Sequence, residues 1–106
     1  MINQSIIQAA EQCLNKEVDA IKALIPRLDD NFVKVIQLIH DCKGKVVVTG
    51  VGKSGHIGSK IAATLASTGT PAFFLNPLDA YHGDLGMIGT EDVVLAISYS
   101  GATEEL

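Results

Sequence analysis

The sequence predicts an α/β fold, in which helices cover a parallel β-sheet and a helical segment precedes it. Three observations favour this fold class. Short apolar runs lie at 45–48, 71–75 and 92–98, helix-like segments separate them, and glycines or hydroxyl residues follow the first and the third. The order strand, helix, strand, helix, strand is typical of a parallel sheet with right-handed crossovers.

The first 42 residues are expected to form a separate segment of two amphipathic helices. The first helix is predicted over residues 3–25, and Pro26 is expected to end it because proline cannot continue a helix. Its apolar side chains recur at spacings of three and four, at Ile6, Ile7, Ala10, Leu14, Val18, Ile21 and Ile25. The apolar faces of the two helices must be buried against other parts of the protein, and a sheet of three strands can barely bury them.

The second helix is predicted to begin with Asp30 as its cap and to end at Gly44. His40 falls near its C-terminus, where a surface position is more typical than a ligand role. The apolar residues expected on one face are Phe32, Val35, Ile36 and Ile39.

Residues 43–106 carry the α/β pattern. The run "KVVVTG" at 45–50 is typical of a strand buried on both faces. A helix of small residues is predicted over 54–69, closed by Gly69, and the segment 76–89 is expected to hold a short helix and a turn. The last residues, "SGATEEL", resemble the first turn of another helix, so we expect the chain to be an N-terminal fragment of a longer protein.

Composition narrows the classes of function. The net charge is −4 with no basic block, which disfavours a nucleic-acid partner. No apolar run approaches the roughly 20 residues that span a bilayer, and the N-terminus lacks the features of a secretory signal. Cys13 and Cys42 are too far apart in sequence for a close metal-ligand pair and are expected to be reduced thiols on apolar helix faces. We therefore expect a cytoplasmic protein.

The stretch "TGVGKSGHIG" at 49–58 suggests a phosphate site, because a strand, a glycine turn and a helix N-terminus aim backbone N–H groups at one point. A triphosphate-binding loop is excluded, since Val47 stands where its first glycine is needed. A dinucleotide site is disfavoured, since no acidic residue precedes Asp79 after the second strand.

The stretch "SYSGATEEL" at 98–106 repeats this arrangement after the third strand. Ser98, Ser100 and Thr103 supply three hydroxyls beside a run of backbone N–H groups that can surround one phosphate. The alternative is that these hydroxyls only cap a helix. Both stretches follow parallel strands, so they are expected to lie side by side at the carboxyl edge of the sheet.

These residues resemble a sugar isomerase (SIS) domain, and in particular the KpsF/GutQ family of D-arabinose 5-phosphate isomerases. The motifs are G-x-G-K-S-G-H-I-G, S-T-G-T-P, H-G-D-L-G and S-x-S-G-x-T, from about Lys43 onward. The resemblance implies a three-layer α/β/α sandwich and an enzyme that interconverts D-ribulose 5-phosphate and D-arabinose 5-phosphate for Kdo or other polysaccharide synthesis. It also implies a homotetramer, further catalytic residues after Leu106, and no cofactor.

The same resemblance implies roles for individual residues. Lys53 and Glu105 match positions tied to catalysis. The positions matched to phosphate or substrate binding are Gly52, Ser54, Thr70, Asn76, His82, Ser98, Ser100 and Thr103. The departures from the family pattern are Tyr99 and Ala102, and neither removes a proposed catalytic group.

Aldose–ketose exchange through an enediol needs a carbon base and a positive group near the enediolate. We assign these roles to Glu105 and Lys53, with Glu104 turned about 100° away on the same helix. Glu105 and Lys53 could instead be plain surface residues, and His82 could be a turn residue, a substrate contact or an adventitious Zn²⁺ ligand. A single histidine is no metal site, so no required metal is expected.

Two other functions remain open from sequence. One is a sugar-phosphate-sensing module without turnover, and the other is an SIS isomerase for a different sugar phosphate. We expect the 106 residues alone to be inactive as an isomerase.

Overall fold

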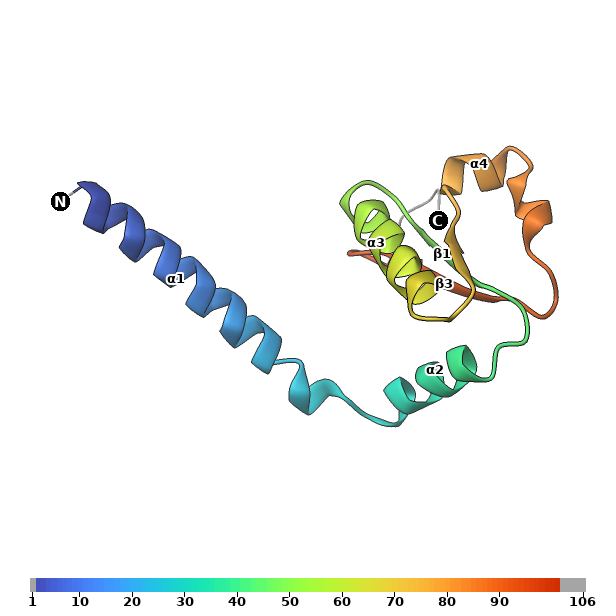
Figure 1. Ribbon diagram of the computed structural model, residues 1–106, viewed down its shortest axis with the longest axis horizontal. Helices are drawn as coiled ribbons and strands as arrows, with labels where there is room; N and C mark the ends of the chain where they lie inside the picture. The colour runs from blue at the N-terminus through green and yellow to red at the C-terminus, as the bar shows by residue number, and fades with distance from the viewer. Residues whose placement is uncertain (1, 102–106) are drawn as a thin grey trace. The chain divides into compact units, whose positions relative to one another are not determined.

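A computed structural model describes residues 2–101 of the chain. The chain divides into two compact units, Met1–Ile36 and Gln37–Leu106. Figure 1 shows the helices and strands of both. No helix among residues 2–101 is long and apolar enough to cross a membrane.

The first unit begins with helix α1, Ile2–Lys22, which is followed by a 3₁₀ turn, Ile25–Arg27. The helix therefore ends three residues earlier than the sequence pattern predicted. The cause is Pro26, because it has no N–H to donate to the carbonyl of Lys22 and its ring would clash with that carbonyl. The chain tightens instead into i→i+3 bonds, such as the Leu24 N–H to the Ile21 carbonyl at 3.0 Å.

Helix α2, Asp30–His40, is capped by Asp29 and not by Asp30 as predicted. The Asp29 carboxylate accepts hydrogen bonds from the N–H groups of Asn31 at 3.0 Å and Phe32 at 3.2 Å. Asp30 itself is the first helical residue, so its side chain lies one position too late for this geometry. The helix ends at His40, ahead of Gly44, and His40 is exposed at its C-terminus as expected.

The second unit is built on a parallel sheet of three strands, in the order β2-β1-β3. The strands are β1, Val46–Gly50, β2, Ala72–Phe74, and β3, Val93–Ile97. The predicted α/β class with a parallel sheet is confirmed. Strand β1 lies in the middle, which explains why its β-branched run is buried on both faces: Val46, Val47 and Val48 have no exposed surface.

Helix α3, Lys53–Ser67, packs on β1 and β2, as Figure 1 shows. Small residues permit this close approach. A Cβ on Gly55 would lie 2.6 Å from the carbonyl oxygen of Gly50, and one on Gly58 would lie 3.2 Å from the side chains of Val48 and Phe74. Ala62 completes the buried contact with the sheet. The small-residue pattern of this helix is therefore explained by packing.

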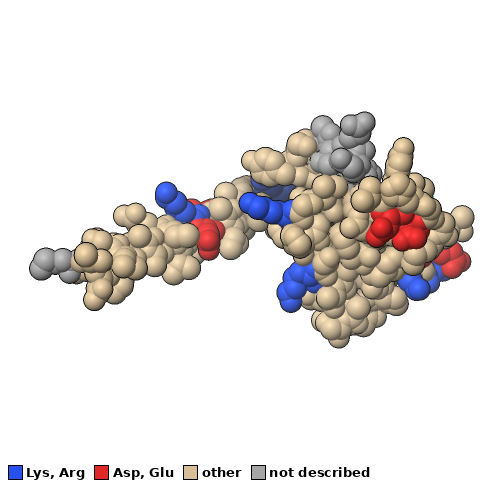
Figure 2. Space-filling model, turned by 90° about the horizontal axis from the view of Figure 1, so that it is seen from above, with Lys and Arg blue, Asp and Glu red and all other residues tan. Residues whose placement is uncertain are grey.

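The segment after β2 forms a short helix α4, Pro77–Tyr81, and a 3₁₀ turn, Asp84–Met87, as the sequence predicted. Both cysteines are free thiols, but Cys42 lies beyond the end of α2 and not on a helix face. Figure 2 shows acidic and basic side chains interspersed on the face it presents, with no patch of a single sign.

A carboxylate joins two turns at the amino edge of the sheet. Asp92 accepts hydrogen bonds from the N–H groups of Lys45 and Gly89, each at 2.7 Å. These backbone donors, first Gly89 and then Lys45, hold the pKa of Asp92 below its ordinary value of 3.8. Asp92 thus ties the entry of β1 to the turn that leads into β3.

Because the pKa of Asp92 is lower in the folded chain, its contribution to stability is present above pH 3.8 and is lost as the pH falls below that value. We expect Asp92→Asn to unfold at lower urea concentration than the wild type at pH 7. The difference should shrink as the pH is lowered through 4 toward 2, as urea titrations at each pH will measure. Asp84→Asn is the control, and an equal pH-dependence of the two variants would contradict this role of Asp92.

Candidate functional site

Two loops leave the carboxyl edge of the sheet next to each other. In the parallel ladder Gly50 is the partner of Ile97, and these are the last residues of β1 and β3. The loop at Val51 and the turn at Ser98 therefore start from adjacent positions on the same edge. This register places the starts of the two predicted phosphate-binding stretches next to each other, as the sequence predicted.

The first loop turns at Gly52, whose φ of +61° is a conformation that favours glycine. No atom lies within 4 Å of the position a Cβ would take there, so the backbone angle, and not crowding, requires glycine. Lys53 is the exposed first residue of α3, and Ser54 follows it. The glycines thus have different tasks: Gly52 makes the turn, whereas Gly55 brings the helix against the strand.

The second loop is a turn closed by Ser98. The Ser98 hydroxyl oxygen accepts a hydrogen bond from the N–H of Gly101 at 2.9 Å, and Gly101 has a φ of +73°. This contact is the capping arrangement considered from sequence. Ser100 lies within the same turn. The predicted site residues Thr103 and Glu105 lie outside the described residues, as do Ala102 and Glu104.

Asn76 follows β2 at the same edge and caps helix α4. Its side-chain oxygen accepts a hydrogen bond from the N–H of Leu78 at 2.9 Å, which leaves the amide N–H groups as donors. His82 ends α4, is exposed, and stacks edge-on against Tyr81 with ring centroids 5.6 Å apart. It carries the turn role considered from sequence and keeps its imidazole accessible.

Thr70 is not brought to this edge. It precedes β2, at the amino edge of the sheet, and its N–H donates to the carbonyl of Leu65 at 2.8 Å. Six residue steps of about 3.3 Å put it up to about 20 Å from Asn76. The described part of the chain thus gathers the loop at 52–54, Asn76 and the turn at 98–100 at one edge, without Thr70.

Two hollows of about 280 Å³ each lie at this edge and share Gly50, Gly52 and Asn76 in their walls. One extends toward Pro77 and Leu78 at the start of α4. The other extends along α3 and is also lined by Gly55, His56, Ser59 and Phe74. His56 and Ser59 were not among the site residues predicted from sequence. His56 and Ser59 are three residues apart, and each lies four residues after Gly52 or Gly55. This helical spacing was the signal that they share one face of α3.

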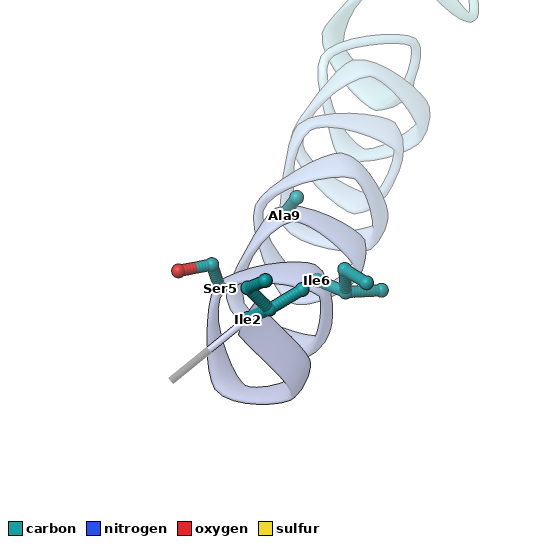
Figure 3. Close-up of a pocket in the computed structure, with 4 residues that line it drawn as sticks. All are labelled: Ile2, Ser5, Ile6 and Ala9. Carbon is teal, nitrogen blue, oxygen red and sulfur yellow. The ribbon is translucent and has the colours of Figure 1, made fainter.

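A further hollow lies beside α1 and is lined by Ile2, Ser5, Ile6 and Ala9. Figure 3 shows that all four side chains come from the first turns of one helix. A single helix face cannot enclose a small molecule, so this hollow is no candidate active site. Among residues 2–101, no three His, Cys, Asp or Glu side chains are placed to hold a metal ion.

Comparison with known proteins agrees with this geometry. The model of the SIS domain matches residues 38–106, which include both loops. The chain belongs to the SIS domain family. This SIS chain also matches curated relatives over nearly its whole length. These matches confirm the resemblance to the KpsF/GutQ family.

Among these relatives is "Arabinose 5-phosphate isomerase GutQ" of Escherichia coli K12, 56% identical over 99% of this chain and 33% of the relative. "Arabinose 5-phosphate isomerase KdsD" of Pseudomonas aeruginosa PAO1 is 55% identical over 98% of this chain and 32% of the relative. A solved structure of an E. coli CFT073 protein in complex with arabinose 5-phosphate has a TM-score of 0.92 and 46% identity, covering 99% of this chain and 56% of that one. The chain thus spans about a third of the length of the curated relatives that it matches.

Proposed function

We propose that this chain forms part of an aldose–ketose isomerase that interconverts D-ribulose 5-phosphate and D-arabinose 5-phosphate. The observation that carries the proposal is the 56% identity to GutQ over nearly the whole chain. The complex of a similar structure with arabinose 5-phosphate supports the same class of ligand. The loop at Lys53 next to the turn at Ser98 supplies a suitable phosphate-binding edge.

The reaction moves one proton between two carbons without a net redox change. A base removes a proton from C1 of the ketose, and the electrons form the C1–C2 double bond of an enediolate with its charge on the C2 oxygen. Transfer of the hydroxyl proton from O1 to O2 and return of a proton to C2 then leave the aldehyde at C1. Glu105 is proposed as the base, and the ammonium of Lys53 is proposed to stabilise the enediolate.

The phosphate group is proposed to bind at the turn after β3, to Ser98, Ser100 and Thr103, with Ser54 contributing from the start of α3. Gly52, Asn76 and His82 are proposed to line the sugar. Thr70 lies at the opposite edge of the sheet, so its proposed contact requires the site of another subunit. Homotetramer assembly, a cytoplasmic location and a place in Kdo or capsule polysaccharide synthesis complete the proposal.

A chimeric protein tests the activity. In it, this chain replaces the aligned third of E. coli GutQ, so that the relative supplies the remaining two thirds. We expect the chimera to convert ribulose 5-phosphate to arabinose 5-phosphate, followed by ¹³C NMR of the sugar carbons. Unmodified GutQ is the control for the assay, and circular dichroism is the control for folding.

Each other outcome identifies a different function. A folded chimera that binds ribulose 5-phosphate without converting it would contradict the isomerase and indicate a sensing module. Conversion of a hexose phosphate in preference to the pentose would indicate a different SIS isomerase.

A further inference from the structure

We propose that His56, together with Ser59, binds the end of the sugar chain farthest from the phosphate group. This inference rests on the proposed function and assigns a role to the hollow along α3. His56 and Ser59 lie about one helical turn apart on α3, and both line that hollow together with Asn76 and Phe74.

The order of the strands determines which part of the substrate reaches this hollow. Strand β1 lies between β3, which carries the proposed phosphate turn, and β2, which leads to Asn76. Neighbouring strands are about 4.8 Å apart, so the edges of β3 and β2 are about 10 Å apart. An open pentose phosphate has six bonds of about 1.5 Å from C1 to phosphorus and extends about 8 Å. With its phosphate at Ser98–Gly101, its far end therefore reaches the side of β1 where His56 lies.

The chemistry of the hollow suits hydroxyl and carbonyl groups. Its polar side chains are an imidazole, a hydroxyl and an amide, from His56, Ser59 and Asn76, and its lining includes no lysine or arginine. Within residues 2–101 the ring nitrogens of His56 make no hydrogen bond, so one can donate and the other accept. Such a set recognises C1 and C2 oxygens, whereas a phosphate favours backbone N–H groups and cations.

Nuclear magnetic resonance of the full 106-residue chain tests this inference directly. The chain has three histidines, His40, His56 and His82, whose ring C–H signals can be assigned by single substitution. We expect arabinose 5-phosphate to shift the His56 ring signals and the Gly101 amide signal. Inorganic phosphate should shift the Gly101 amide without moving His56, and His40 should respond to neither probe.

The other outcomes separate the two proposals. A shift of Gly101 by arabinose 5-phosphate without His56 would overturn the role of His56 and leave the proposed function standing. A His56 shift of equal size with inorganic phosphate would also overturn it, because His56 would then bind the phosphate. No response of His56 to either probe, together with an active chimera, would overturn the role of His56 and leave the proposed function standing.

Kinetics of the GutQ chimera give a second readout. Loss of a hydrogen bond to substrate corresponds to about a tenfold loss of affinity. We expect His56→Ala to raise KM for ribulose 5-phosphate about tenfold with a smaller change in kcat, and His40→Ala to change neither. An unchanged KM in His56→Ala, with the wild-type chimera active, would overturn the inference.

Discussion

Gly55→Ala is expected to destabilise the second unit by about 1–3 kcal/mol, although alanine is the better helix former. The gain in helix propensity is about 1 kcal/mol. Against it stands a Cβ placed 2.6 Å from the Gly50 carbonyl oxygen, a backbone atom of the central strand that cannot rotate away. Relief requires α3 to move off β1, which opens the contact around Val48 and Ala62. Urea unfolding of the chain, followed by circular dichroism, will measure the change.

Gly86→Ala is the matched control for this variant. No atom lies within 4 Å of the position of its Cβ, and its backbone is outside the positive-φ region. We expect its free energy of unfolding to stay within about 0.5 kcal/mol of the wild type. Equal stabilities of the two variants would show that the approach of α3 to β1 is not limited by the Cβ.

Lys53→Met is expected to lower kcat of the GutQ chimera by about 10²–10³-fold. The variant is expected to remain folded. Removal of one group that stabilises a developing oxyanion typically has an effect of this size. Lys53 is exposed at the first turn of α3, so methionine can replace its aliphatic stem without loss of packing. Steady-state rates with ribulose 5-phosphate will give kcat and KM separately.

Lys60→Met provides the comparison, since Lys60 is an exposed lysine on the same helix, two turns farther from the carboxyl edge of the sheet. We expect its rates to equal those of the unsubstituted chimera. If Lys53→Met raised KM alone, its ammonium would bind the ground state and the enediolate role would be wrong.

The burial of the central strand on both faces was predicted correctly from sequence. Val46, Val47 and Val48 form a continuous β-branched run, which is typical of a parallel strand covered on both faces. The ends of the first two helices were less accurate. Proline acts on the carbonyl four residues before it, which moved the end of α1 to Lys22, and two consecutive aspartates left the cap position ambiguous until the Asp29 contacts were seen.

For the site, sequence spacing predicted the two loops and their common edge because parallel topology determines where strands end. The spacing did not show which glycine forms the turn and which allows close packing of the helix, since a single sequence does not distinguish these two roles. His56 was missed for a similar reason, because its place beside Asn76 depends on how close α3 approaches β2. Thr70 belongs to the S-T-G-T-P motif of the family, but it lies at the opposite edge of the sheet from the other described site residues.

The strand order β2-β1-β3 has a consequence for where a ligand can enter. The chain leaves β1 toward β2 on one side, and later returns to place β3 on the other side. The direction of winding therefore reverses at β1, and open parallel sheets bind their ligands in the crevice outside such a topological switch point. Substitutions in the loops on either side of this crevice can therefore change which ligand binds, while the buried valines of β1 keep the sheet folded.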